Sequence, residues 1–346
     1  MKQPEQSAGP TLHPSRGRFV AGGAAVFATI AVVRAKGRAA DFELKCGTQL
    51  PADDKASLRL TEMWAAIERE SGGRVKTQFF PASALGSEVA MFSQLRLGAL
   101  DFQHLTAGTL AALVPVANIA YLGFAYKDSE EGIRLFEGPL GQYVAKETAS
   151  KGLYMFHSMW KVGMGEVGTN GRPVAKADDL RGLKIRVSAN KISVDLFSEL
   201  GASATPLNFA DVYPGLQTKL VDGVSSSLAI IESSKWYEVL KFASMTNHQW
   251  YNQMLIANGE TWRKLPPDLQ KIVDRNNTKY ALLERKDMDA YNAAATKNLQ
   301  ARGITIGPVD RASFTRRLQS YYKAWAAEFG PTAWRLLEAG LGHKLG

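Results

Sequence analysis

Residues 178–223 alternate strand-like and helix-like patterns, and this order constrains the fold more than any other part of the chain. In Leu183–Val187, apolar side chains alternate with Lys184 and Arg186. Alternation with a period of two predicts a strand that carries both cations on one face. Arg186 stands near the carboxyl end of this strand, where open α/β sheets present their ligand-binding groups.

The pattern continues with a helix, a second strand and a second helix. Lys191–Leu200 is helix-like and ends at Gly201, where a left-handed C-cap is favourable. The short apolar run Ala204–Leu207 reads as a strand, and it is followed by Asn208 with Asp211 three positions later. Asn at an N-cap with an acid in the first turn predicts the start of a helix. Strands that alternate with helices predict parallel βαβ units.

Five stretches of the chain, in this order and spacing, resemble the substrate-binding proteins of tripartite ATP-independent periplasmic (TRAP) transporters. They are Phe79–Phe102, Arg172–Val187, Pro206–Gly223, Ser234–Phe242 and Asn258–Gln270. The resemblance runs from about Phe42 to the C-terminus. It implies an α/β fold of two lobes, each with a mixed or parallel sheet flanked by helices, and a long helix that spans both lobes.

The patterns outside this core segment agree with such a fold. Strands are predicted at Phe42–Gln49, Val75–Phe80, Asp101–Leu105 and Leu153–Met159, and helices at Ser57–Glu70, Glu88–Arg96, Pro267–Arg302, Ala312–Phe329 and Thr332–Ala339. We expect the first lobe to comprise residues 41–163 with 252–291, and the second 164–251 with 292–346.

The N-terminus has the pattern of a secretory signal peptide over residues 1–39. Arg16 and Arg18 precede the apolar run Phe19–Val33, and small residues follow it. We expect cleavage between Ala35 and Ala40 and a periplasmic location, with an uncleaved membrane anchor as the alternative. Export by the Sec route and by the twin-arginine (Tat) route both stay open, because Gly17 stands where a second consecutive arginine would be.

The net charge of +9 does not indicate a nucleic-acid partner. Residues 1–39 contain six basic residues and one acidic residue, so +5 of that charge lies in the signal peptide. The remaining +4 is spread over a chain of mixed sign, without a basic run.

Motifs for catalysis, metals and cofactors are not recognisable in the chain. The five histidines are scattered: His13, His104, His157, His248 and His343. Gly163–Gly168 matches the letters GxGxxG, but Thr169–Pro173 follows as a turn instead of the helix that a dinucleotide site requires. We therefore expect a protein that is not an enzyme and has no cofactor, and we expect these glycines to mark a crossover between the lobes.

Arg186 is the main candidate for ligand binding. Its guanidinium stays charged and matches a carboxylate in two parallel hydrogen bonds. The resemblance implies the same role, since the arginine of the corresponding strand is the carboxylate clamp of the family. Many family members also have a second arginine where this chain has Gly165, and an asparagine where it has Ser226. We expect a ligand-free cleft to expose Arg186 to water.

Aromatic residues and one acid complete the candidate site. Phe209, Trp160, Tyr213 and Trp250 are candidates to line the cleft, with core packing as the alternative for each and as the favoured interpretation for a fifth aromatic residue, Trp236. Glu88 resembles a family acid that reaches the cleft, and it could equally stabilise the start of its helix. One cation with several rings favours a monocarboxylate that has an apolar or aromatic body.

The resemblance also implies the partners. We expect a receptor that captures a small organic acid between closing lobes and delivers it to TRAP membrane permease subunits, as a monomer or a homodimer. A C4-dicarboxylate or a 2-oxo acid is the alternative ligand, and ligand sensing is the alternative to transport.

Overall fold

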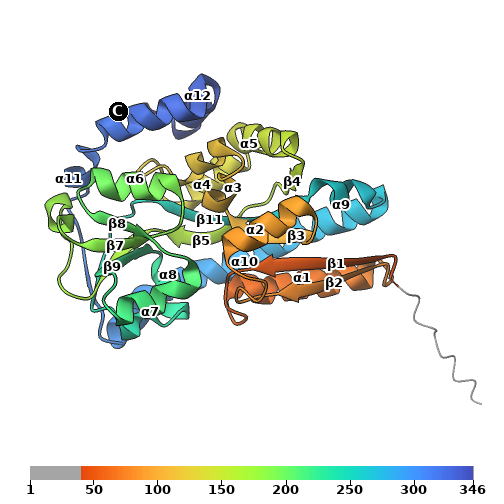
Figure 1. Ribbon diagram of the computed structural model, residues 1–346, viewed down its shortest axis with the longest axis horizontal. Coiled ribbons are helices and arrows are strands. Elements are labelled where there is room, and N and C mark those ends of the chain that lie inside the picture. The colour runs from red at the N-terminus through yellow and green to blue at the C-terminus, as the bar shows by residue number, and fades with distance from the viewer. Residues whose placement is uncertain (1–39, 346) are drawn as a thin grey trace, which may run out of the picture. The chain divides into compact units, whose positions relative to one another are not determined.

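The computed structural model describes residues 40–345, so the proposed signal peptide lies outside the described part of the chain. Two mixed β-sheets flanked by helices make up residues 40–345, as Figure 1 shows. The predicted α/β class with two lobes is confirmed. None of the described helices is long and apolar enough to cross a membrane.

The first sheet has six strands and contains the N-terminal βαβ units. Its order is β2 (Val75–Phe80), β1 (Phe42–Thr48), β3 (Phe102–Thr106), β11 (Trp250–Asn258) and β4 (Leu153–Met155), with β5 (Trp160–Met164) also paired to β11. The strands β1, β2 and β3 are parallel, as predicted, and are connected by α1 (Lys55–Glu70) and α2 (Glu88–Leu97). The central strand β11 runs antiparallel to its neighbours.

The second sheet also has six strands and contains the arginine strand. Its order is β12 (Thr305–Gly307), β10 (Phe242–Ser244), β6 (Glu166–Thr169), β9 (Gly223–Ser226), β7 (Lys184–Val187) and β8 (Ser203–Pro206). The predicted parallel pairing of β7 with β8 is present, with α6 (Lys191–Glu199) between them. The helices α7 (Val212–Gln217) and α8 (Leu228–Ser233) flank β9 in sequence.

Two chain segments run side by side from one sheet to the other. One passes from β5 through Gly165 to β6, and the other enters β11 through His248 and Gln249. Gly165 N donates to Gln249 O at 2.7 Å, and His248 N donates to Gly165 O at 3.0 Å. The GxGxxG stretch Gly163–Gly168 is therefore a crossover between the sheets, as predicted from the turn that follows it.

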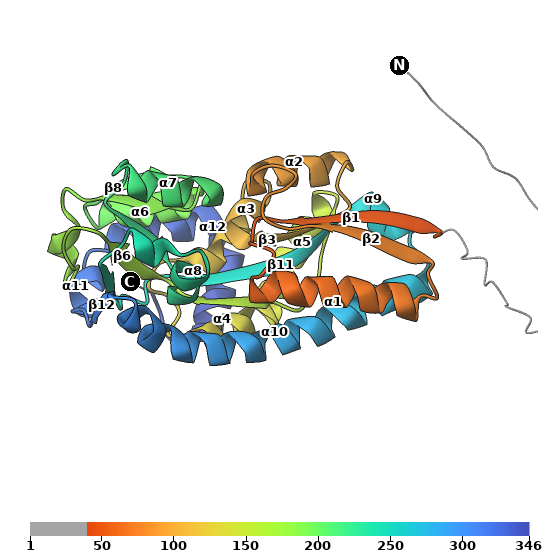
Figure 2. The same ribbon diagram turned by 90° about the horizontal axis from the view of Figure 1, so that it is seen from below.

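A single long helix, α10 (Pro267–Ala301), reaches both sheets. It packs against α1 beside the first sheet and against α8 beside the second, and Figure 2 shows it running below both. The helix starts with Pro267, whose missing N–H costs nothing at the first helical position. The predicted helix that spans both lobes is confirmed.

The remaining helices cover the two sheets. They are α3 (Ala107–Leu110), η1 (Pro115–Tyr121), α4 (Ser129–Phe136), α5 (Pro139–Ser150), η2 (Ala177–Leu180), η3 (Phe209–Asp211), η4 (Trp236–Glu238), α9 (Gly259–Lys264), α11 (Arg311–Thr315) and α12 (Gln319–Leu341). Helix α12 contacts η1, α4, α5 and α6 and kinks at Gly330, whose φ is 78°. The proposed lobe limits, with 292–346 in the second lobe, stay a prediction.

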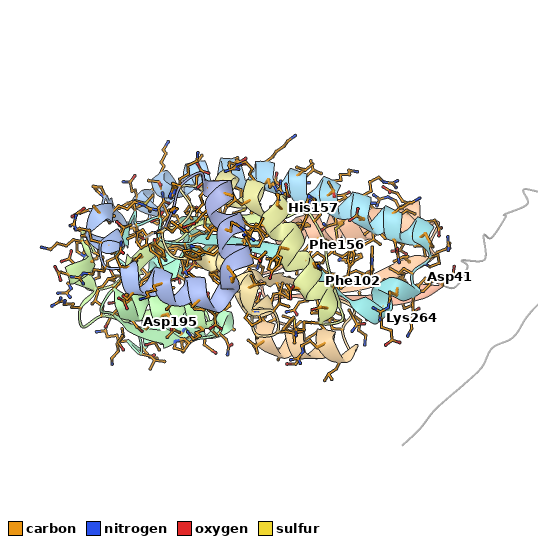
Figure 3. All side chains as sticks on the ribbon, turned by 90° about the horizontal axis from the view of Figure 1, so that it is seen from above. Asp41, Phe102, Phe156, His157, Asp195 and Lys264 are labelled. Carbon is orange, nitrogen blue, oxygen red and sulfur yellow. The ribbon has the colours of Figure 1, made fainter. Side chains whose placement is uncertain are left out.

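Aromatic side chains fill the interior of the first lobe. Phe102 and Phe156, labelled in Figure 3, have ring centroids 6.2 Å apart. Trp64 meets Phe102 edge to face at 5.0 Å, a geometry that the ring quadrupoles favour. This packing connects α1 to the sheet that it covers.

Three local predictions are wrong or incomplete. Asn208 does not cap the backbone of a following α-helix, because η3 intervenes and its side chain donates to Asp211 instead. The predicted helix Ala312–Phe329 is divided into α11 and the first part of α12. The nine-residue strand β11 was not predicted, since it is buried on both faces and its sequence shows no period of two.

Candidate functional site

Arg186 lies in β7 with its guanidinium held by the next strand connection. Its Nε and Nη2 atoms donate to the carbonyl oxygen of Leu207 at 3.1 and 2.8 Å. Only 5% of the residue is exposed in this arrangement of the lobes, and its exposure to water in an open cleft stays a prediction. Burial lowers its pKa to about 10, which leaves the group a cation at neutral pH.

Two small cavities meet at Arg186, and their walls come from both sheets. The first, of about 50 Å³, is lined by Gln49, Leu50, Thr106, Tyr121, Val162, Arg186, Ser188, Phe209, Ser225, Ser226, Ile230, Tyr251, Asn252 and Gln253. The second, of about 40 Å³, is lined by Gln49, Glu88, Val89, Thr106, Thr109, Arg186, Ser188, Ala189, Asn190, Leu207, Asn208 and Phe209. Arg186 is the one cation among these lining residues. The guanidinium of Arg186 has five N–H donors, and only two of them donate to Leu207 O.

Glu88 lines the second cavity at the N-terminus of α2. Its carboxylate accepts hydrogen bonds from Thr106 N at 2.9 Å, from Thr106 Oγ1 at 3.0 Å and from the hydroxyl of Thr109. Burial raises its pKa, and these donors and the charge of Arg186 oppose that rise. Glu88 thus contributes an acceptor to the wall that faces Arg186.

Ser226 and Phe209 also line the cavities. Ser226 is buried in β9, opposite Glu166 of β6, and it faces the first cavity. Phe209 lies in η3 and borders both cavities, with its ring centroid 5.4 Å from that of Trp236. The structure therefore brings four of the seven candidate residues together: Arg186, Glu88, Ser226 and Phe209.

The other three candidates do not line these cavities. Trp160 is fully buried, and its Nε1 donates to Asn277 Oδ1 of α10 at 3.1 Å. Trp250 is also fully buried and packs edge to face against Tyr126 and Phe136. Tyr213 donates its hydroxyl proton to Glu238 at 2.7 Å. Core packing, the alternative considered for these residues, describes both tryptophans.

Sequence reasoning missed the polar residues of β11 and its neighbourhood, Tyr251 above all. Tyr251 lines the first cavity together with Asn252 and Gln253, and the pairing of β11 with β5 shifts register between Tyr251 and Asn252. Tyr251 Oη lies 2.6 Å from Ser225 Oγ, which is 2.7 Å from His248 Nε2. The sequence of β11 carries no alternation that could have assigned Tyr251 to the cavity.

Gly165 faces this group of side chains at close range. A Cβ atom at Gly165 would lie 2.7 Å from Tyr251 Cε2 and 2.9 Å from His248 Nε2. Both rings are buried, so a side chain at this position would have to displace them. In this chain, the rings of Tyr251 and His248 thus fill the space into which a side chain at position 165 would project.

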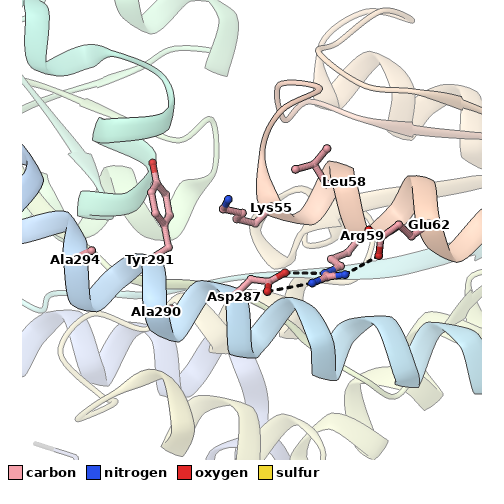
Figure 4. A pocket seen from close by; sticks show the side chains of 8 residues that line it. All are labelled: Lys55, Leu58, Arg59, Glu62, Asp287, Ala290, Tyr291 and Ala294. Carbon is pink, nitrogen blue, oxygen red and sulfur yellow. Dashed lines mark hydrogen bonds and ion pairs between the residues drawn. The ribbon is translucent and has the colours of Figure 1, made fainter.

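A larger and more open cavity of about 470 Å³ lies on another face, between α1 and α10 (Figure 4). Of its two lining cations, Arg59 is already paired, since Nε donates to Asp287 Oδ2 at 2.6 Å and Nη1 donates to Glu62 at 2.6 Å. The other, Lys55, has its Nζ 5.7 Å from the ring centroid of Tyr291. Paired and partly exposed charges offer little to an anionic ligand. We therefore place the candidate site at Arg186.

Metal binding finds no support in the described part of the chain. No group of three or more His, Cys, Asp or Glu residues within 40–345 could hold a metal ion. Cys46, the single cysteine, is buried, and burial raises the pKa of its thiol to about 12.

The sequence profile of the bacterial extracellular solute-binding proteins, family 7, matches residues 46–328. This protein belongs to that family. The predicted resemblance to TRAP substrate-binding proteins is confirmed, and the family is one of solute-binding proteins.

Curated and solved family 7 proteins agree with this assignment. The chain is 32% identical over 264 residues to the sialic acid-binding periplasmic protein SiaP of Vibrio cholerae, covering 76% of this chain and 82% of SiaP. A TRAP periplasmic solute-binding protein from Chromohalobacter salexigens with bound D-glucuronate has a TM-score of 0.82 at 26% identity, covering 86% of this chain and 99% of that chain. A TRAP protein from Polaromonas with bound D-erythronate has a TM-score of 0.82 at 29% identity, with coverages of 88% and 100%.

Proposed function

We propose that this protein is the solute receptor of a TRAP transporter and binds a small hydroxylated monocarboxylate between its lobes. The observation that carries the proposal is Arg186, which is the one cation among the lining residues of both cavities. Leu207 O accepts from Nε and one Nη2 proton, so the Nη1–Nη2 edge keeps the parallel donors that a carboxylate matches. A second carboxylate on the ligand would find no second cation in this wall.

The walls favour a ligand body that carries hydroxyl groups. Most of the polar lining consists of hydroxyl and amide side chains, namely Gln49, Thr106, Tyr121, Ser188, Ser225, Ser226, Tyr251, Asn252 and Gln253. Such groups both donate and accept hydrogen bonds, and a buried polar wall that a ligand leaves unpaired is costly. The expected apolar or aromatic body rested on five aromatic residues, and among those only Phe209 borders the cavities. We therefore retain the monocarboxylate and replace its apolar body with a hydroxylated one.

The size of the cavities favours a short acid. A water molecule needs about 10–15 Å³ of cavity volume, so cavities of about 50 and 40 Å³ hold only a few waters each. A four-carbon sugar acid suits this space better than a hexuronate does. Similar proteins support the class, since solved relatives carry bound D-erythronate, D-glucuronate or D-galacturonate.

Entry of a ligand requires the lobes to separate, because Arg186 is buried in this arrangement. The two crossover segments at Gly165 and at His248–Gln249, together with α10, are the connections about which they would turn. Better contacts in the closed state would then shift the lobes toward closure. We propose that the exported protein in this closed form is recognised by membrane permease subunits.

Calorimetric titration of the exported protein tests the proposed ligand class. The panel contains D-erythronate, D-glucuronate, succinate, 2-oxobutanoate, phenylacetate and the neutral sugar alcohol erythritol. We expect D-erythronate to bind best, succinate and phenylacetate to bind at least tenfold more weakly, and erythritol not to bind. Preferred binding of phenylacetate would restore the aromatic body, and preferred binding of succinate would favour the dicarboxylate alternative. Binding of erythritol comparable to that of the acids would contradict the carboxylate clamp.

A further inference from the structure

A chain of four side chains runs from the crossover to the first cavity. Thr246 Oγ1 lies 2.7 Å from His248 Nδ1, His248 Nε2 lies 2.7 Å from Ser225 Oγ, and Ser225 Oγ lies 2.6 Å from Tyr251 Oη. All four residues are buried, and Tyr251 and Ser225 line the cavity beside Arg186. Each link has the length of a good hydrogen bond, so the direction of the protons along the chain is the open question.

Thr246 decides this direction because its hydroxyl has one proton and one well-placed acceptor. Its other acceptors are Gly165 O at 3.4 Å and Glu166 Oε2 at 3.5 Å, both beyond the usual range for a hydroxyl donor. Donation to His248 Nδ1, at 2.7 Å, is therefore the best-placed use of this proton. Burial lowers the pKa of His248 to about 3, so the imidazole is neutral, and with Thr246 as donor its single proton lies on Nε2.

The remaining links follow from counting donors. With this tautomer, His248 Nε2–H donates to Ser225 Oγ, and the Ser225 proton is then directed to its other neighbour, Tyr251 Oη. Tyr251 Oη then accepts from Ser225, so the Tyr251 hydroxyl proton is available for donation to a group in the cavity. Hydrogen bonds arranged head to tail polarise one another, which strengthens the terminal donor.

We propose that Thr246, His248, Ser225 and Tyr251 form a one-way hydrogen-bond relay that presents the Tyr251 hydroxyl proton to the ligand carboxylate held by Arg186. This inference rests on the proposed function of Arg186. The relay occupies the space beside Gly165, and a neutral donor there takes the place of a second cation. A ligand with one carboxylate satisfies both Arg186 and Tyr251, whereas a second negative charge would meet only a neutral hydroxyl.

The first test measures the tautomer of His248 and needs no ligand. Long-range ¹H–¹⁵N correlation spectra of the ¹⁵N-labelled exported protein, assigned with a His248→Gln variant, distinguish protonated from unprotonated ring nitrogens. We expect a protonated Nε2 and an unprotonated Nδ1. A protonated Nδ1 would reverse the relay, since Ser225 would then donate to His248 and Tyr251 to Ser225, and the inference would be overturned.

The second test measures binding of D-erythronate by calorimetry. Tyr251→Phe removes the terminal donor and is expected to weaken binding about 10- to 100-fold, the range for a hydrogen bond to a charged group. Tyr143→Phe, which alters a phenol of α5 outside the cavities, is the control and is expected to bind as the parent does. Equal binding by the Tyr251→Phe and parent proteins would overturn the inference.

Thr246 does not line either cavity, so changing it tests whether it acts through the tautomer of His248. Thr246→Val removes the donor that holds the His248 tautomer, so we expect mixed tautomers and D-erythronate binding weakened about 3- to 30-fold. Thr246→Ser keeps the hydroxyl and is expected to restore both the tautomer and the affinity. If Thr246→Val weakened binding while the tautomer stayed unchanged, a general structural role would replace the relay. Failure of the parent protein to bind any acid would overturn the proposed function and the carboxylate target together, whereas parent binding with unaffected variants would overturn the relay alone.

Discussion

The guanidinium of Arg186 is clamped on one edge by the carbonyl oxygen of Leu207, which accepts from both Nε and Nη2. This contact joins the strand β7 to the chain that leaves β8, and it orients a buried cation before any ligand arrives. A donor group that is already oriented loses less entropy on binding. The Nη1–Nη2 edge of the guanidinium is therefore already oriented to bind one carboxylate.

Arg186→Lys is expected to weaken carboxylate binding by about 2–4 kcal/mol, or roughly 30- to 1000-fold. A lysine ammonium keeps the charge but replaces the planar fork by a point donor, and it cannot bond both Leu207 O and a carboxylate in parallel. Ser226→Ala is the matched comparison and is expected to cost only about 0.5–1.5 kcal/mol, as for a neutral hydrogen bond. Calorimetry with D-erythronate on both variants measures the difference. Parent-like binding by Arg186→Lys together with lost binding by Ser226→Ala would move the anchor to Ser226.

Trp160→Phe is expected to lower the free energy of unfolding by about 1–3 kcal/mol without changing the dissociation constant for D-erythronate more than twofold. The change removes the donor that pairs with buried Asn277 and leaves a small void beside α10. Denaturant unfolding and calorimetry check the two quantities separately. Phe209→Leu is the opposite case, because Phe209 borders both cavities and is only partly buried, so binding should change more than stability. A large loss of affinity in Trp160→Phe would return that tryptophan to the site.

Gly165→Ala is expected to destabilise the protein by about 1–3 kcal/mol, because the new methyl group would overlap the buried rings of Tyr251 and His248. Gly171→Ala is the control, since a Cβ there meets nothing within 4 Å and surface changes of this kind stay within about 0.5 kcal/mol. Thermal unfolding of both variants measures the contrast. Equal stability of the two would mean that the rings move aside at little cost.

Glu166→Gln is expected to make stability less dependent on pH. Burial raises the pKa of Glu166 in the folded protein to about 8, above the ordinary value of 4.5. The folded state therefore binds a proton more tightly, and the stability that this proton contributes is complete below pH 4.5 and is lost as the pH rises through about 8. Free energies of unfolding measured from pH 4 to 9 should show the parent becoming less stable than the variant by up to a few kcal/mol at the alkaline end. The exposed Glu43→Gln should follow the parent, and parallel curves for all three proteins would contradict the buried, protonated Glu166.

The exported protein is expected to begin between Lys36 and Asp41. Signal-peptide cleavage after the small residues that follow Phe19–Val33 would produce this N-terminus. Intact mass spectrometry of the periplasmic fraction measures it. A soluble cytoplasmic protein that retains Met1 would contradict the proposed export.

Local patterns in the sequence determined the parts of the fold whose residues interact with near neighbours. The strand alternation around Arg186, the helix stop at Gly201 and the proline at the start of α10 each report a backbone preference that holds within a few residues. Arg186 was a candidate from its strand pattern and from the family resemblance, Glu88 and Ser226 from the resemblance, and Phe209 as a nearby aromatic residue. The glycines 163–168 were recognised as a crossover because a turn follows them.

Tertiary structure alone decided which face each candidate presents and which polar groups meet. Trp250 belongs to the core and Tyr251 to the cavity, which the sequence could not tell apart because β11 is buried on both sides and shows no alternation. Trp160 of β5 likewise belongs to the core, where it bonds Asn277 of α10. Ser225 of β9 meets His248 and Tyr251, which belong to the continuous stretch 246–251, only after both sheets have formed. The burial of Arg186 likewise depends on the approach of the two lobes, a long-range contact that no local pattern encodes.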